Sequence, residues 1–216
     1  MRGIRSRFVQ VDEMHSFVFV RQKNLNPARH DDRTMGEQYL FIAMDSETKL
    51  VPSFVIGKRN IENAYYLMED LQSRLATRIQ LTTDGFRPYV NAVDATFGSA
   101  IDYAMLVKAY SGEESARERY SPSEIVDARP VPVMGNPKPH RISTSHIERQ
   151  NLTVRMQLRR FTPLTNAFSK KLENMKAALN LYFAWYNFCR VHSSLRVTPA
   201  MASGISDHIW SIGEVL

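Results

Sequence analysis

The first part of the chain consists of short apolar runs that are rich in β-branched and aromatic residues. Such runs predict strands at 7–20, 39–44 and 50–56. A polar and charged stretch at 25–36 predicts a loop after the first strand, and Asp45 falls in a predicted turn at 45–48. Three strands in succession with short connections favour an antiparallel meander.

Strands and helices alternate after this meander. Asn60 predicts the N-cap of a helix to about residue 77, because Ile61, Tyr65 and Met68 recur at helical spacing. A strand at 78–83, a helix at 88–97 and a fifth strand at 101–107 are predicted next. This order favours an α/β fold: a ribonuclease-H-like mixed sheet of about five strands, flanked by helices on both faces.

The next segment has five prolines and little periodicity, which predicts an irregular insertion at about 110–142. Ser143 or Thr144 is expected to cap the helix that follows. A kink is expected near Pro163, and a last helix at about 170–189.

These elements predict two parts of the chain. A ribonuclease-H-like catalytic domain is expected over residues 1–160, with the irregular insertion before its last helix. A C-terminal helical extension is expected over residues 161–216.

Composition narrows the class of protein. A hydrophobic fraction of 44% excludes a disordered chain, and a formal net charge of +6 favours a polyanionic partner. The single cysteine, Cys189, excludes an internal disulfide and an all-cysteine zinc site. With no signal-peptide core and no apolar run of roughly 20 residues, we expect a cytoplasmic protein with no membrane partner, associated with the nucleoid through DNA.

Three acids occupy informative positions. Asp12 lies inside the first predicted strand, where a charge is costly unless it is paired, Asp84 follows the fourth strand, and Glu148 lies in the first turn of a helix. Taken singly, Asp84 is more often a turn residue and Glu148 more often a helix-terminal acid. Together they predict a catalytic and metal-binding site.

The expected cofactor is Mg²⁺, or Mn²⁺, with two ions. Phosphodiester transfer develops charge on the attacking and leaving oxygens, and two divalent ions about 3.5–4 Å apart stabilise both. Hard carboxylate oxygens suit these ions. Asp12 would bridge them, with Asp84 on one ion and Glu148 on the other. Glu13 is expected to point to the opposite face of its strand and is therefore secondary.

The helix that carries Glu148 is basic. At about 100° per residue, Glu148, Arg155 and Arg159 fall on one face, which is either a solvated surface or a track for phosphates. The residues predicted to bind DNA are Arg149, Asn151, Arg155, Arg159, Arg160, Lys170 and Lys171.

Three segments, 12–18, 82–89 and 146–153, resemble the acidic motifs of IS1-family insertion-sequence transposases, and 159–171, 186–190 and 195–201 extend the resemblance over nearly the whole chain. The resemblance implies a DDE catalytic domain that depends on Mg²⁺, cleaves a DNA strand and transfers its 3′-hydroxyl. It maps the triad onto Asp12, Asp84 and Glu148. The expected partners are DNA, both element ends and target, and further copies of the chain on that DNA.

The sequence departs from the family in two places. His15 stands where the family usually has tryptophan, and only residues 1–11 precede the first acid, where relatives carry zinc-ribbon and helix-turn-helix parts. We therefore expect that such a part is separately encoded or missing. Two other readings stay open: a catalytically inactive DNA-binding remnant, and a ribonuclease-H-like nuclease.

Overall fold

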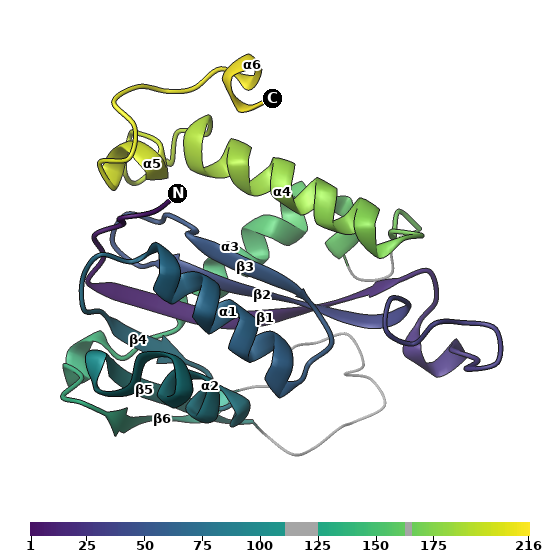
Figure 1. Cartoon of the computed structure of the whole chain (residues 1–216), viewed down its shortest axis with the longest axis horizontal. Coiled ribbons are helices and arrows are strands. Elements are labelled where there is room, and N and C mark those ends of the chain that lie inside the picture. The colour runs from purple at the N-terminus through teal and green to yellow at the C-terminus, as the bar shows by residue number, and fades with distance from the viewer. Residues whose placement is uncertain (111–124, 163–165) are drawn as a thin grey trace.

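A computed structural model describes residues 1–110, 125–162 and 166–216 and shows one mixed sheet with helices on both faces (Figure 1). The strands are β1 (Phe8–Val18), β2 (Gly36–Asp45), β3 (Ser53–Gly57), β4 (Gln80–Thr83), β5 (Asp102–Tyr110) and β6 (Ile125–Met134). The α-helices are α1 (Ile61–Arg74), α2 (Pro88–Phe97), α3 (Ser145–Gln157), α4 (Leu172–Phe188), α5 (Pro199–Ala202) and α6 (Ile212–Val215). Single 3₁₀ turns are η1 (Gln22–Asn24), η2 (Gly98–Ala100), η3 (Pro139–Arg141) and η4 (Arg159–Phe161).

The strand order across the sheet is β3-β2-β1-β4-β5-β6. The strands β1, β4 and β5 are parallel to one another, whereas β2 is antiparallel to β1, β3 to β2, and β6 to β5. The predicted meander and the alternation of strand and helix are thereby confirmed. The order is compatible with a ribonuclease-H-like fold.

The strand β2 shows why both faces of the sheet are covered. Its residues are apolar at consecutive positions, and Phe41 and Ala43 pack under α1 and α2, whereas Leu40, Ile42 and Met44 pack under α3 and α4. Successive side chains of a strand point to opposite faces, so a continuous apolar run requires two cores. Helices α1 and α4 lie on opposite sides of the sheet in Figure 1.

Helices α1 and α3 begin in different ways. The predicted cap of α1 is confirmed, because the side chain of Asn60 accepts a hydrogen bond from the Asn63 amide at 3.1 Å. At the start of α3, Thr144 makes no side-chain capping bond, but Ser143, the other predicted cap, accepts a hydrogen bond from the Ser145 amide at 3.2 Å. The buried side chain of Gln10 on β1 accepts from the next two amides, those of His146 and Ile147, each at 3.0 Å. The start of α3 is therefore fixed to β1.

The prediction of five strands and of an irregular segment at 110–142 is wrong in part. Residues 125–134 form β6, a sixth strand, with Pro130 opposite Leu106 and Pro132 opposite Ala104. Proline cannot donate to a ladder but is tolerated at a sheet edge, and β6 is the edge strand. Residues 135–142 of the predicted segment form no further strand and contain the turn η3, whereas 111–124 and the predicted kink at Pro163 lie outside the described residues.

The helix predicted to carry Arg159 ends before that residue. Helix α3 stops at Gln157, and Arg159 begins the 3₁₀ turn η4. The periodicity predicted that Arg159 shares a helical face with Glu148 and Arg155. That prediction is wrong, because Arg159 lies beyond the end of α3. Within the described residues, no helix is long and apolar enough to span a bilayer.

Candidate metal centre

Three carboxylates meet where β4 ends. Oxygen atoms of Asp12, Glu13 and Asp84 all lie within 4.8 Å of one another. The register explains the meeting, because Val11 on β1 is paired with Thr83 on β4, and the next residue along each strand is an aspartate. The prediction that Asp12, within the first strand, converges with Asp84, at the end of the fourth, therefore agrees with the geometry.

Glu13 was expected to face away from this site, and that prediction is wrong. Strand β1 continues to Val18, whereas its pairing with β4 stops at Val11. Beyond that point, among the described residues, no strand pairs with the β4-side edge of β1, and Val18 makes only an isolated bridge with Ser169. The side chains of Asp12 and Glu13, although successive in the strand, can therefore both approach Asp84 at this edge. A second acid directly after Asp12 was the signal in the sequence.

The carboxylates of Asp12, Glu13 and Asp84 repel one another, and their pKa values are raised. Burial, followed by the charges of Asp84 and Glu13, raises the pKa of Asp12 to about 7. Burial and Asp84 raise the pKa of Glu13 to about 6, and burial also raises the pKa of Asp84. Like charges that share a site disfavour one another's ionised forms. A divalent cation would relieve this repulsion.

Arg59 partly balances the acids from the loop before α1. Its Nε donates to Glu13 Oε1 at 2.7 Å, and its Nη2 lies 3.9 Å from Asp84 Oδ2. The guanidinium lies over the ring of Phe86, with its carbon 4.1 Å from the ring centroid. Tyr89, which is buried, donates its hydroxyl to the other Glu13 oxygen at 3.0 Å. Glu13 is thus the acid with the most protein partners, and nothing in the sequence pattern pointed to Arg59.

Asp12 is oriented from two sides. Its Oδ1 accepts from the backbone amide of Glu13 at 2.9 Å, and its Oδ2 accepts from the side-chain amide of Asn151 at 2.8 Å. Asn151 is only 8% exposed, and its contact with DNA stays a prediction. Its hydrogen bond to the Asp12 carboxylate was not anticipated from the sequence.

Glu148 lines the same cavity as Asp12 and Asp84, whose volume is about 870 Å³. Its charge is near enough to raise the pKa of both aspartates. Within the described residues, however, it lies outside the group of three oxygens that are mutually within 4.8 Å. The Glu148 carboxylate is bound instead by the Lys108 ammonium and by the Thr144 hydroxyl. Lys108, on β5, was not anticipated from the sequence.

The predicted DNA-binding residues differ in their surroundings. Arg155 lines the acidic cavity, and Arg160 is held by the hydroxyl of Ser169 at 2.9 Å. The other four cations of the predicted set are exposed, namely Arg149, Arg159, Lys170 and Lys171. Whether they bind DNA stays a prediction.

The donor set has a chemical preference. All three clustered groups offer carboxylate oxygen, which suits Mg²⁺, Mn²⁺ or Ca²⁺ better than metals that favour nitrogen or sulfur. Both oxygens of Asp12 and both oxygens of Glu13 accept hydrogen bonds from protein donors, whereas Asp84 accepts one at Oδ1 alone within the described residues. Asp12, Glu13 and Asp84 can together hold one metal ion.

No protein-family model matches the chain. A search of curated proteins likewise found no significant match.

Proposed function

We propose that the chain is the catalytic domain of a DDE-type DNA transposase with a ribonuclease-H-like fold. It would cleave a DNA strand and join the resulting 3′-hydroxyl to a target, using two Mg²⁺ or Mn²⁺ ions. The observation that carries this proposal is the meeting of Asp12 and Asp84 in a cavity that Glu148 also lines. The strand order and the origin of these acids on β1, after β4 and on α3 support it further.

Each acid has a part in this proposal. Asp12 and Asp84 would hold the ions, and Glu148 would join them once its carboxylate leaves Lys108. Bound there, the ions would activate the attacking oxygen and stabilise charge on the leaving oxygen. Glu13 would stay with Arg59 and Tyr89, and Asn151 would keep Asp12 aimed at the cavity. Arg155 would contact a phosphate of the strand being cut.

The same proposal covers the partners. DNA, as element end and as target, fits the net charge of +6 and the arginine beside the acids. Several copies of the chain would assemble on the DNA. The nucleoid would be its place in the cell.

A plasmid assay tests the proposal without knowledge of the element ends. Supercoiled plasmid and a labelled duplex with a free 3′-hydroxyl are incubated with the protein in Mn²⁺ or Mg²⁺. We expect nicked circles and label joined to the plasmid, both lost in Asp84→Asn and in Glu148→Gln, while gel-shift affinity for the duplex is unchanged. Arg5→Ala, an exposed substitution in the segment before β1, is the control for protein quality.

The other outcomes separate the alternative readings. DNA binding without nicking by the wild-type protein, in either metal, would identify an inactive remnant. Metal-dependent nicking without joining of the label would identify a ribonuclease-H-like nuclease. Full activity in Asp84→Asn would refute the proposed site.

A further inference from the structure

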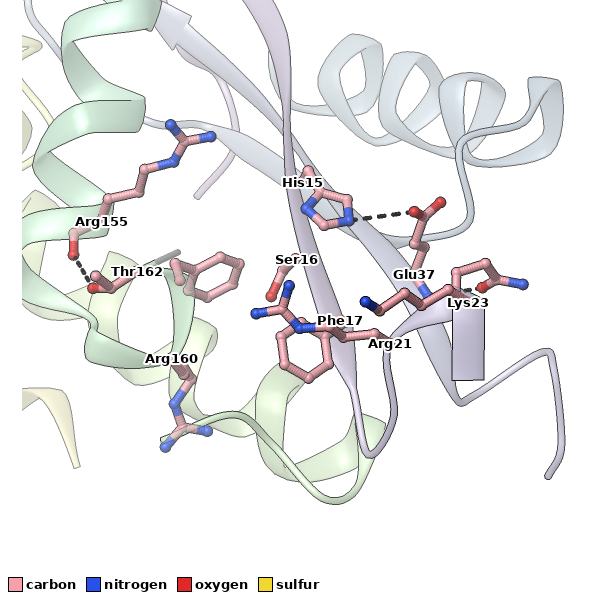
Figure 2. Close-up of a pocket in the computed structure, with 11 residues that line it drawn as sticks. His15, Ser16, Phe17, Arg21, Lys23, Glu37, Arg155, Arg160 and Thr162 are labelled. Atoms are coloured by element: carbon pink, nitrogen blue, oxygen red, sulfur yellow. Dashed lines mark hydrogen bonds and ion pairs between the residues drawn. The ribbon is translucent and has the colours of Figure 1, made fainter. Parts of the chain in front are cut away.

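A second cavity, of about 430 Å³, lies beside the acidic one, between the end of β1, the turn η1 and the C-terminal end of α3 (Figure 2). Its volume is within the range of small-ligand sites. The lining residues are His15, Ser16, Phe17, Arg21, Gln22, Lys23, Glu37, Arg155, Arg160, Phe161 and Thr162.

This cavity carries an excess of positive charge. Arg21 and Lys23 reach it from one side and Arg155 from the other, as Figure 2 shows. The only acid among its lining residues is Glu37, whose carboxylate lies 3.6 Å from His15 Nε2. The cavity therefore favours an anion.

Two buried polar atoms of the lining residues have no hydrogen-bond partner within the described part of the chain. They are Oγ of Ser16, a residue only 4% exposed, and Nε of Arg155. Leaving a buried polar group unpaired costs about 1–3 kcal/mol. Because Ser16 and Arg155 both line the cavity, a polar ligand held there would satisfy these two atoms once the side chains turn toward it.

The cavity also offers a surface for stacking. The guanidinium carbon of Arg21 lies 5.3 Å from the centroid of the Phe17 ring, and the ring of Phe168 supports Phe17 with centroids 5.1 Å apart. Nucleobases stack on aromatic rings and on arginine planes alike. A ligand that has both a flat ring to stack on this surface and an anionic group to bind the cations is a nucleotide.

The two cavities are linked. Arg155 lines both of them, and Ser16 lies four positions after Asp12 on β1, which corresponds to about 13 Å along a strand. A DNA strand with its reacting phosphate at the acids would pass this second cavity within a few nucleotides. A single unstacked base is small enough to turn into it.

We propose that this cavity takes one unstacked nucleotide of the DNA strand that reacts at the acidic cavity. Its base would stack against Arg21 and Phe17, and its phosphate would bind Lys23 and Arg155, with Ser16 Oγ within reach of the sugar or phosphate. The proposal rests on the proposed function, because it requires DNA at the neighbouring acids. A free mononucleotide has the same chemistry, and the experiment must separate the two sources.

The test uses single-stranded oligonucleotides with 2-aminopurine at each of the first six positions from the 3′ end. Titrated with Asp84→Asn protein, which binds but does not cut, one position should change in fluorescence and the others should not. Arg21→Ala and Lys23→Ala in this background should abolish that change and weaken binding roughly five- to ten-fold. Both side chains are exposed, so neither substitution threatens the fold. Lys23→Ala should also reduce the slope of log affinity against log salt by about 1.

Arg5→Ala is the matched control, because it removes one exposed positive charge from the segment before β1, at the other end of that strand. It should leave the fluorescence change intact. A uniform response at all six positions, or equal effects of Arg5→Ala and Arg21→Ala, would overturn the proposal. So would tight binding of deoxyadenosine monophosphate that Arg21→Ala abolishes, without any position-specific change in DNA. A protein that nicks plasmid but shows no such position retains the proposed function and loses only this inference.

Discussion

Asn151 on α3 donates a 2.8 Å hydrogen bond to Asp12 on β1, a residue 139 positions earlier in the chain. This bond connects the helix that carries Glu148 to the acid at the centre of the candidate site. Asn151 is buried and Asp12 is half-buried, which makes the bond stronger than an exposed one. Asn151 was predicted to contact DNA, but this geometry points to a positioning role.

Asn151→Ala should weaken binding of Mn²⁺ about ten-fold, which is typical of a lost partner behind a metal ligand. A hydrogen bond to the ionised carboxylate favours that form, so its loss should raise the pKa of Asp12 further. The pH midpoint of metal binding should accordingly move upward. Calorimetric titration between pH 6 and 8.5 measures both effects.

Gln72→Ala serves as the control, since Gln72 donates its amide to the Thr96 carbonyl on the far side of the sheet. An equal loss of metal affinity in both variants would mean that general destabilisation, not positioning, is the cause. An unchanged pH midpoint in Asn151→Ala would likewise remove the positioning role.

The metal-free protein should lose stability as pH rises. Asp12 and Glu13 have pKa values of about 7 and about 6 in the folded chain, above the roughly 4 expected when unfolded. The folded state therefore binds more protons between these limits, and its free energy of unfolding falls from about pH 4 to pH 7. Asp12→Asn should flatten this dependence and be more stable than the wild type at pH 8 by on the order of 1–2 kcal/mol.

Urea unfolding in EDTA at pH 4.5 and pH 8 measures this difference. Addition of Mg²⁺ at pH 8 should restore stability to the wild type but not to Asp12→Asn, because only the former offers the full set of ligands. If the two proteins show the same pH dependence in EDTA, the repulsion between these acids is not a determinant of stability.

The parts of the fold that depend on local pattern were predictable. The runs of β2 and the helical spacing from Ile61 to Leu71 place both elements within a few residues of their observed ends. Strand β6 was missed because Pro130 and Pro132 argue against a strand. That rule applies inside a sheet, and no local signal reveals that a segment will lie at the edge.

The convergence of Asp12 and Asp84 could be predicted from the sequence. Asp12 lies in the first strand and Asp84 follows the fourth, and these two strands are neighbours in the sheet. The inclusion of Glu13 depends on β4 stopping before β1 does, and the pairing of Lys108 with Glu148 depends on how α3 is placed over β5. Both are consequences of tertiary packing, which no spacing along the chain encodes.

Lys108→Met should strengthen metal binding. Lys108 is largely buried and holds the Glu148 carboxylate, so its charge both occupies a prospective ligand and repels a cation. Methionine keeps the length and apolar volume of the side chain but removes the ammonium. We expect Mn²⁺ affinity to rise about five-fold, and Glu148→Gln to lower it, as measured by calorimetry at pH 8.

Lys176→Met is the matched control, because it removes the same charge from an exposed position on α4. It should leave the affinity unchanged. A fall in affinity in Lys108→Met would show that Lys108 supports the site in its present form and does not compete with the ion.

Gln10→Leu should loosen the start of α3 and, with it, Glu148. Gln10 Oε1 accepts two helix amides, those of His146 and Ile147, and Ile147 is fully buried. Leucine has a similar size but no acceptor, so both amides would be left without their partner at a cost of about 2–3 kcal/mol. Glu148 directly follows Ile147, so its position should also be disturbed. DNA nicking should therefore fall by a larger factor than the fraction of folded protein does.

Asn60→Ala separates this effect from helix capping in general. It removes the side-chain cap of α1, which should cost about 1 kcal/mol and leave nicking unchanged in the folded protein. Urea unfolding gives the two costs, and amide hydrogen exchange at His146 and Ile147 locates the first. Rapid exchange there in Gln10→Leu, with protected amides elsewhere in α3, would show that one side chain on β1 sets where the acidic helix begins. Protected amides and full stability would instead mean that packing of Ile147 alone is sufficient to hold it.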